Sequence, residues 1–463
     1  MFSRAGGMSL GSYRGVDLPA SGRLHDRPAT EIGQGPFSRA TDITMSKDIT
    51  MRTDTIVLGA GIIGVCVALH LQAKGRDVVI IDRKAPGSET SFGNAGLIER
   101  SSVVPYAFPR QVSAMMRFGF NRSSAVRYDP LYLVKLAPWL ARYWWHSEPA
   151  RLLSVVEAMR PLIERSVVEH DILAVEAGVQ GLIRADGWIE TFRTKANQER
   201  ALRTAERNSP YGLKYSILDR KALKTLESAL LDGPIGGIHW HDPKTVTDPG
   251  GLVKAYADLF VRKGGQILMG DARSLRQSDG GWAVKTEEGA VIGREAVVTL
   301  GPWADQLLVP LGYRMPMAVK RGYHMHYALD APHALNHSLV DEHGGYVLAP
   351  MTRGVRLATG VEFAAPGAPP KEAQLRQAET IARTVLPLGR RLDATPWLGL
   401  RPCLPDMKPV IGPAQRHKGL WFAFGHAHHG LTLGPVTGRL LAEMVTGETP
   451  FTDPTPYSAQ RFG

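Results

Sequence analysis

The chain has 463 residues, of which 44% are hydrophobic and 21% are charged, as is typical of a globular protein with two or three domains. Its two cysteines, Cys66 and Cys403, lie far apart, and this excludes a disulfide framework and a Cys-based zinc site. The net charge of +11 favours anionic ligands, but no nucleic-acid-binding motif accompanies it, so we expect no nucleic-acid partner. No apolar run reaches membrane-spanning length, and we expect a cytoplasmic protein.

Residues 1–50 are rich in Gly, Ser, Arg and Pro and show no periodicity. Such a composition cannot bury enough apolar surface to fold, which predicts a disordered N-terminal extension. Met45 and Met51 are alternative start sites, because both immediately precede the first predicted strand.

A β-α-β unit follows. Thr55–Leu58 is a short β-branched apolar run, typical of a buried parallel strand, and a glycine turn leads from it into an apolar helix ending near Ala73. A second strand, Val78–Ile81, ends in Asp82. This unit is the usual setting of a dinucleotide-binding turn.

The glycine turn has the GxGxxG pattern, and each part has a physical role. Gly59 permits the tight turn, Gly61 lets a pyrophosphate approach the backbone, and Gly64 allows close packing of helix on strand. The helix N-terminus, starting at Ile62, offers unpaired N–H groups to phosphates. Asp82 lies 18 residues after Gly64, close to the spacing expected for an acid that binds the adenosine ribose.

The rest of the chain contains further elements in order. Residues 85–96 are a polar loop, residues 106–145 hold ten aromatics, and helices are expected over 150–178, 250–263 and 370–386. Strands are expected at 296–300, 315–327, 346–359 and 419–424, and a last helix ends near Met444. The strand before Gly301 and the block at 419–430 look like later returns to the first sheet. Such a discontinuous domain favours FAD over NAD.

Several blocks carry a family resemblance. The loop Glu89–Gly96, the strand Lys320–Tyr323, the block Gly399–Gly412 (GLRP…PD…P…IG) and the glycine-rich turn Gly425–Gly434 occur in the order found in D-amino acid dehydrogenases. Over about residues 54–450 the chain resembles this group of the D-amino acid oxidase (DAO) superfamily.

The resemblance implies a mixed α/β fold with two domains. A Rossmann-type FAD-binding domain would comprise 51–100, 240–310 and 396–450, and a substrate domain on a mostly antiparallel sheet would comprise 101–239 and 311–395. Residues 451–463 would form a C-terminal tail.

The resemblance also implies oxidative deamination of a D-amino acid, with hydride transfer from Cα to flavin N5 and an imine that hydrolyses to a 2-keto acid. Related enzymes attach the flavin to a cysteine, but the corresponding position here is Gly399 rather than Cys403, so we expect non-covalent FAD. Open alternatives are an O₂-using oxidase, a sarcosine, glycine or D-hydroxyproline substrate, a non-catalytic FAD-binding regulatory module and an NAD-dependent dehydrogenase.

Candidate site residues follow. Arg401 suits a substrate carboxylate, since its guanidinium matches a carboxylate in two parallel hydrogen bonds, although a structural ion pair is the alternative. Tyr323, Tyr346 and His429 are pocket candidates, and each of the tyrosines is otherwise a core residue. Backbone N–H groups near Gly430 would stabilise negative charge on the flavin. The turn that contains His426, His428 and His429 (the histidine turn) carries no carboxylate, so we expect no metal there. The expected cofactor-binding residues are Gly59, Gly61, Ile62, Ile63, Gly64, Asp82, Arg83, Ser91, Asn94, Ala95, Gly96, Gly301, Gly425, Gly430, Leu431 and Thr432.

The aromatic segment 106–145 is flanked by cations, a combination that suits a membrane interface. One hypothesis is that it touches the inner membrane face, where quinone or another respiratory partner takes the electrons. The alternative is that the aromatics pack inside the substrate domain.

Overall fold

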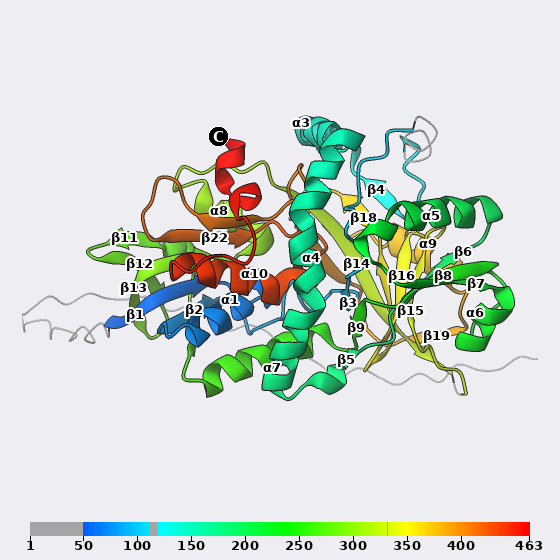
Figure 1. The fold of residues 1–463 in the computed structure, drawn as a ribbon, viewed down its shortest axis with the longest axis horizontal. Helices are drawn as coiled ribbons and strands as arrows, with labels where there is room; N and C mark the ends of the chain where they lie inside the picture. Colours follow the sequence, from blue (N-terminus) through cyan, green and yellow to red (C-terminus); the bar gives the residue numbers. More distant parts are fainter. Residues whose placement is uncertain (1–49, 112–118, 331) are drawn as a thin grey trace, which may run out of the picture. The chain divides into compact units, whose positions relative to one another are not determined.

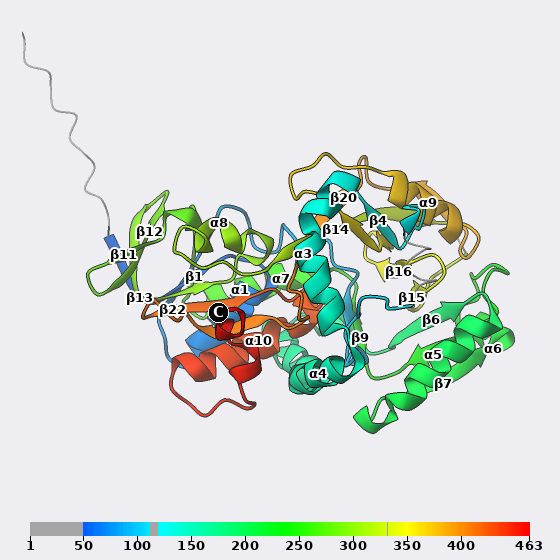
Figure 2. The same ribbon diagram turned by 90° about the horizontal axis from the view of Figure 1, so that it is seen from above.

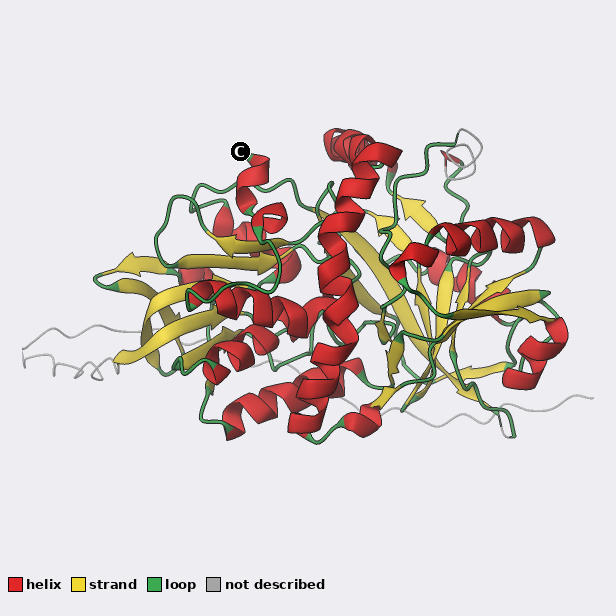
Figure 3. Cartoon of the chain, in the orientation of Figure 1, coloured by secondary structure: helices red, strands yellow, loops and turns green. Residues whose placement is uncertain are grey.

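The computed structural model describes residues 50–111, 119–330 and 332–463. The predicted N-terminal extension therefore lies outside the described residues except for Thr50, and so does Phe118 of the aromatic segment. Helices and strands are mixed along the described chain, which confirms the α/β fold class (Figures 1 and 3).

The first sheet contains the predicted β-α-β unit. Its central strands β1, β2 and β13 pair in parallel and are apolar because both faces of the sheet are covered. The first strand starts earlier than predicted, since its N-terminal part also pairs with β13, from Thr50 opposite Ala290. In the described chain the sheet has eight strands: β10 (Gln266–Met269), β2 (Val78–Asp82), β1 (Thr50–Leu58), β13 (Gly289–Val298), β12 (Gly281–Thr286) and β11 (Arg276–Ser278), with β22 (Leu420–Phe424) beside β13 and β21 (Val410–Pro413) beside β22.

The second sheet is mostly antiparallel, as the family resemblance implies. Only two of its described pairs, β15 with β6 and β18 with β4, are parallel. Its eleven described strands are β4 (Val126–Tyr128), β18 (Val361–Phe363), β14 (Ala318–Leu329), β17 (Gly354–Thr359), β16 (Tyr346–Met351), β15 (Ser338–Asp341), β6 (Trp188–Phe192), β8 (Gly236–Trp240) and β7 (Tyr215–Asp219), with β19 (Leu388–Arg391) and β20 (Trp397–Cys403) on β14.

A small sheet of β3 (Leu97–Ile98), β9 (Lys244–Val246) and β5 (Ile183–Arg184) completes the described strands. Helices α5 and α6 lie on the β6–β8–β7 end of the second sheet (Figure 2), whereas α4 packs against α7 and α10. The helices, apart from short 3₁₀ turns, are α1 (Ile62–Ala73), α3 (Pro130–His146), α4 (Pro149–Ala177), α5 (Lys195–Arg207), α6 (Arg220–Leu226), α7 (Pro249–Arg262), α8 (Ala304–Leu308), α9 (Ala373–Ala382) and α10 (Gly430–Val445).

Two elements, β20 and α4, do not pack with the sheet to which the expected domain boundaries assign them. Strand β20 falls in the expected FAD-binding segment 396–450, yet all seven of its residues pair with β14 of the second sheet. Helix α4 falls in the expected substrate segment, yet it packs on α7 and α10 beside the first sheet. Strand pairing and apolar contacts, rather than sequence order, decide both placements.

Helix α3 was not predicted, because the aromatic content of residues 106–145 indicated no particular secondary structure. Asp129 caps it by accepting hydrogen bonds from the N–H groups of Leu131 and Tyr132, and Pro130 occupies its first turn. No helix in the described ranges is long and apolar enough to cross a membrane.

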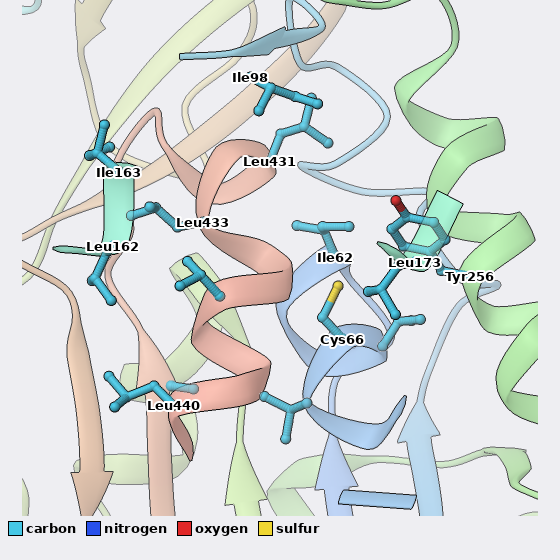
Figure 4. Packing of buried hydrophobic residues seen from close by; sticks show 14 of the residues in the cluster. Ile62, Cys66, Ile98, Leu162, Ile163, Leu173, Tyr256, Leu431, Leu433 and Leu440 are labelled. Carbon is cyan, nitrogen blue, oxygen red and sulfur yellow. The ribbon is translucent and has the colours of Figure 1, made fainter. Parts of the chain in front are cut away.

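The core beside the first sheet depends on close contact between α1 and α10. Helix α1 is apolar on nearly all sides, because it lies between the sheet and other helices. A Cβ atom at Gly438 of α10 would lie 2.5 Å from the carbonyl oxygen of Cys66, and one at Gly434 would lie 2.5 Å from Ile62 Cγ1. Figure 4 shows Ile62 and Cys66 of α1 beside α10, whose Leu433 and Leu440 point away from α1 toward Leu162 and Ile163. Small residues thus set the distance between the helices.

We expect Gly438→Ala to lower the free energy of unfolding by about 1–3 kcal/mol, because the added methyl group pushes against the α1 backbone. This loss would exceed the gain of about 1 kcal/mol that alanine normally brings to a helix. Denaturant unfolding of the holoenzyme measures the change. The control is Gly181→Ala, where a Cβ meets nothing within 4 Å. Equal stability of the two variants would contradict the packing argument.

Candidate active site

A cavity of about 560 Å³ extends from the glycine turn of the first sheet to the second sheet. Strands β1, β2, β13 and β22 all end at this cavity, since residues directly following each of them line it. Ligands of open parallel sheets bind beyond the carboxyl ends of the strands. The cavity is thus in the expected position for a nucleotide. It continues as far as Arg401 and Tyr346 on the second sheet.

The glycine turn leaves its backbone open to a ligand. Gly59 has a φ of +112°, a conformation that side chains disfavour, and a Cβ at Gly64 would lie 1.8 Å from the Gly59 carbonyl oxygen. Asp82 Oδ2 accepts a 2.6 Å hydrogen bond from the Ala60 N–H. The acid at the end of β2 therefore holds the turn as well as facing the cavity.

The loop between residues 89 and 96 is clamped onto the second sheet. Arg356 Nη1 donates a 3.0 Å hydrogen bond to the Phe92 carbonyl, and a Cβ at Gly93 would lie 1.7 Å from the Trp397 ring. On the other side, the Ile62 N–H donates a 3.0 Å hydrogen bond to Ser91 Oγ. The loop thus connects the start of α1 to the second sheet and forms one wall of the cavity.

A second helix N-terminus lines the same cavity. After β22 the chain turns at Gly425, with a φ of +84°, and α10 begins at Gly430 without a side-chain cap. Gly430 and Leu431 line the cavity. The first N–H groups of a helix carry a partial positive charge, so this end stabilises negative charge on a bound group. A glycine turn, a strand-end acid and two helix N-termini along one cavity fit FAD.

Arg401 presents an unneutralised cation to the cavity. It donates hydrogen bonds to the carbonyl oxygens of Gly360 (2.8 Å) and Thr359 (3.2 Å), and no carboxylate among the described residues pairs with it. Desolvation by burial lowers the pKa of its guanidinium. Because a buried charge without a partner is costly, the remaining N–H donors suit an anionic ligand.

Tyr323 lines the cavity, but its hydroxyl already has three partners. It donates to Glu362 Oε2 (2.7 Å) and accepts from Arg321 Nη2 (3.0 Å) and from the Lys371 N–H (2.9 Å). These contacts saturate the hydroxyl and leave no free donor or acceptor for a substrate.

Tyr346 also lines the cavity, and its hydroxyl donates a 2.8 Å hydrogen bond to Asp341 Oδ2. Asp341 in turn forms a 2.9 Å ion pair with Arg193. Burial, followed by the charge of Asp341, raises the pKa of Tyr346, so the phenol remains protonated. Its oxygen keeps lone pairs for one further donor.

The carboxylate of Glu99 lies beside the histidine turn in the cavity. Glu99 Oε2 lies 3.5 Å from His429 Nε2, and the rings of His428 and His429 are 3.8 Å apart. Glu99 follows β3, and its N–H donates a 3.1 Å hydrogen bond to Thr432 Oγ1 of α10. This hydrogen bond holds Glu99 near the histidine turn, although Glu99 and Thr432 are 333 residues apart in the sequence.

The charges in this cluster are strongly influenced by burial. Burial by itself would raise the pKa of Glu99, but the polar contact with His429, the proximity of His428 and the Ser102 hydroxyl outweigh it and lower that pKa to about 2. Burial lowers the pKa of His428 well below its usual value. The Nε2 atoms of both histidines are buried without a hydrogen-bond partner in the described chain.

The cluster corrects one premise of the sequence analysis. The histidine turn does have a carboxylate beside it, and ligand atoms of Glu99, His428 and His429 lie within 4.8 Å of one another, as a metal site requires. However, the charges of Arg401 and Lys320 act on His428. Added positive charge is disfavoured there, and we assign no metal to the cluster.

Most of the predicted site residues meet at the cavity. Arg401, Tyr323, Tyr346 and His429 line it, as do all predicted cofactor-binding residues except Gly64, Gly96 and Thr432. Gly64 instead packs against Gly59, the role that its position in the motif predicts.

Four further residues line the cavity without having been predicted as site residues: Glu99, Tyr106, Glu190 and Lys320. Only Glu190 had a recognisable signal, because it is an acid within the apolar run Trp188–Phe192. Lys320 begins the block Lys320–Tyr323, which gave no role to this lysine, whereas Glu99 and Tyr106 stand outside any motif.

Comparison with known proteins identifies the family. Residues 54–444 match the family described as FAD dependent oxidoreductase (DAO). The D-amino-acid oxidase of Bradyrhizobium diazoefficiens is 30% identical over 415 residues, which are 88% of this chain and 98% of that protein. The D-amino acid dehydrogenase of Rhizobium johnstonii is 30% identical over 419 residues, covering 88% and 99%.

Solved structures agree on the fold. Glycine oxidase from Geobacillus kaustophilus superimposes with a TM-score of 0.67 at 20% identity, covering 89% of this chain and 99% of that one. L-Proline dehydrogenase from P. horikoshii gives a TM-score of 0.67 at 17% identity, covering 89% and 98%. The family match selects FAD rather than NAD as the cofactor. The chain belongs to the FAD-dependent oxidoreductase (DAO) family.

Proposed function

We propose that the protein oxidises the C–N bond of a D-amino acid, using non-covalently bound FAD, to an imine that hydrolyses to a 2-keto acid and ammonia. The unneutralised Arg401 in the cavity carries this proposal, together with the names of the relatives at about 30% identity. When bound, the flavin accepts the hydride from Cα; the protein supplies binding, orientation and proton transfer.

Arg401 would bind the substrate carboxylate. Two of its N–H donors hold the guanidinium to the carbonyls of Thr359 and Gly360, so the group is already positioned before substrate arrives. The free donors then pair with a carboxylate whose charge replaces the missing counter-ion. Preorganisation of this kind reduces the entropy lost on binding.

Glu99 and His429 would receive the amine. A substrate ammonium must lose a proton before its nitrogen can release the hydride from Cα. His429 Nε2 is buried without a hydrogen-bond partner and suits the role of acceptor, while the adjacent Glu99 carboxylate stabilises the resulting imidazolium. The His428 ring lies beside that of His429, tilted by 43°, and adds no charge because burial lowers the pKa of its imidazole well below the usual value.

Non-covalent attachment is supported by Cys403. This is the one cysteine among the cavity-lining residues of the described chain. Burial raises the pKa of its thiol, so the thiolate that a flavin linkage would need is disfavoured.

The electron acceptor would be a respiratory quinone reached at a membrane surface. Part of the aromatic segment, including Trp139 and Tyr143, is buried. The outer face of α3 nevertheless exposes Leu131 (80%), Val134 (74%) and Trp145 (53%), with exposed Lys135 and Arg142 among them. Apolar groups interspersed with cations favour an anionic lipid surface.

The first test is anaerobic mixing of the yellow holoenzyme with D-, L- and N-methyl amino acids and glycine. We expect D-amino acids to bleach the visible flavin absorbance and L-amino acids to leave it unchanged. Bleaching by glycine or N-methyl amino acids alone would establish that alternative substrate class. A flavin that no compound reduces would overturn the proposal.

Arg401→Met should weaken substrate binding about 10- to 100-fold, since charged hydrogen bonds contribute roughly 1.5–3 kcal/mol. The apparent dissociation constant from the concentration dependence of flavin bleaching measures this. Arg401→Lys should retain part of the affinity, because it keeps the charge but loses the two-pronged geometry. Unchanged binding by Arg401→Met would exclude the carboxylate role.

Co-sedimentation with vesicles tests the membrane contact. Wild-type protein should bind phosphatidylglycerol vesicles at low salt more strongly than phosphatidylcholine vesicles, and Leu131→Glu/Trp145→Glu should reduce this binding by about tenfold or more. Ile172→Glu, at another exposed apolar position on α4, is the control. Equal binding by the two variants would refute the α3 surface.

A further inference from the structure

We propose that Glu190 forms a subsite for a cationic group on the substrate side chain, so that the enzyme prefers D-amino acids with a basic side chain such as D-lysine or D-arginine. This inference rests on the proposed function and specifies its substrate class. It starts from an acidic side chain for which neither the fold nor the oxidation step accounts.

Glu190 lies in the middle of β6, an otherwise apolar strand of the second sheet. Its strand neighbours Ile189 and Thr191 are buried, and so are Trp188 and Phe192. Glu190 itself lines the cavity shared with Arg401. A carboxylate in this setting loses most of its hydration and needs a compensating partner.

The described residues do not supply such a partner. No ion pair involves Glu190, whereas the neighbouring acids do have one: Arg193 pairs with Asp341, and Arg200 pairs with Glu342. On the adjoining strand β8, the indole N–H of Trp240 acts on Glu190 and lowers the pKa of its carboxyl group, but it carries no charge. Glu190 is therefore a carboxylate that faces a ligand cavity without a cation.

The charges along the cavity run from positive to negative. Arg401 and Lys320 act on His428, which adjoins Glu99. Tyr106 comes next: its ring lies 4.9 Å from that of His428, and its pKa is raised by burial and then by the charges of Glu99 and Glu190.

Tyr106 lines the cavity, although 64% of its surface is exposed. Because the charges of Glu99 and Glu190 both act on its hydroxyl, it lies near both acids. A substrate with its carboxylate on Arg401 and its α-amine toward Glu99 would direct its side chain past Tyr106 to Glu190. Among amino acids, a cationic side chain matches such a terminal carboxylate.

The protonation of Glu190 makes the preference depend on pH. Burial, together with the charge of Glu342, raises its pKa to about 7, while the Trp240 N–H and Arg200 oppose the shift. Below this pKa the group is neutral and attracts no cation. As the pH rises through it, Glu190 ionises and the preference for cationic side chains should increase.

The experiment compares D-lysine with D-norleucine, an uncharged substrate of similar length, on the holoenzyme. The measured quantity is the ratio of the second-order rate constants for anaerobic flavin bleaching. We expect a ratio above about ten, falling by about tenfold or more in Glu190→Gln. Glu206→Gln, which removes an exposed acid on α5, is the control for net charge.

A binding readout accompanies the rates. The probe 6-aminohexanoate is lysine without its α-amine and cannot be oxidised at Cα, and hexanoate is the matched compound that lacks the terminal ammonium group. The change in the flavin spectrum on titration gives both dissociation constants. Wild type should bind 6-aminohexanoate more tightly, increasingly so as the pH rises through about 7, and Glu190→Gln should lose both the preference and its pH dependence.

The outcomes separate the two proposals. If D-norleucine and D-lysine both bleach the flavin with equal efficiency in wild type and Glu190→Gln, the cationic subsite is wrong and the proposed function stands. If neither compound bleaches the flavin but 6-aminohexanoate still binds in a Glu190-dependent manner, the subsite stands and D-amino acid oxidation is wrong. The absence of both effects overturns both.

Discussion

The rest of the structure depends on one constraint, the tight glycine turn that follows β1 at the carboxyl end of the first sheet. Gly59 and Gly64 approach each other so closely that a Cβ at Gly64 would overlap the Gly59 carbonyl, and Asp82 holds the turn through the Ala60 N–H. With no side chains in the way, α1 begins directly at the cavity. The Gly434 and Gly438 contacts then bring α10 against α1, so that two helix N-termini face the same space.

Both a cation, Arg401, and an anion, Glu99, line that space. Arg401 reaches the cavity because β20 pairs with β14, and its guanidinium is held by backbone carbonyls rather than by a carboxylate. Glu99 reaches it from the other side, because β3 is tied to α10 through Thr432. Under the proposed function, an amino acid zwitterion would pair with both groups and would offset the desolvation cost of each.

The family match covers residues 54–444, yet solved structures that share the fold are named for different substrates, among them glycine and L-proline. A fold shared by proteins with such different names does not by itself specify a substrate, so under the proposed function the side chains lining the cavity would select it. In this chain those side chains include Tyr106, Glu190 and Tyr346. Their hydrogen bonds and charges, rather than the nucleotide motif, would determine specificity.

The sequence by itself determined the nucleotide-binding unit, the mixed fold and the approach of Arg401 to the site, because these depend on local patterns: a glycine turn between strand and helix, apolar periodicity and a short motif block. The tertiary structure alone decided that Glu99 meets His429, that the Tyr323 hydroxyl is saturated by Glu362 and Arg321, and that Glu190 faces the cavity. It also moved β20 and α4 across the expected domain boundaries. These features arise from strand pairing and packing between segments far apart in the chain, and no local pattern records which residues such contacts bring together.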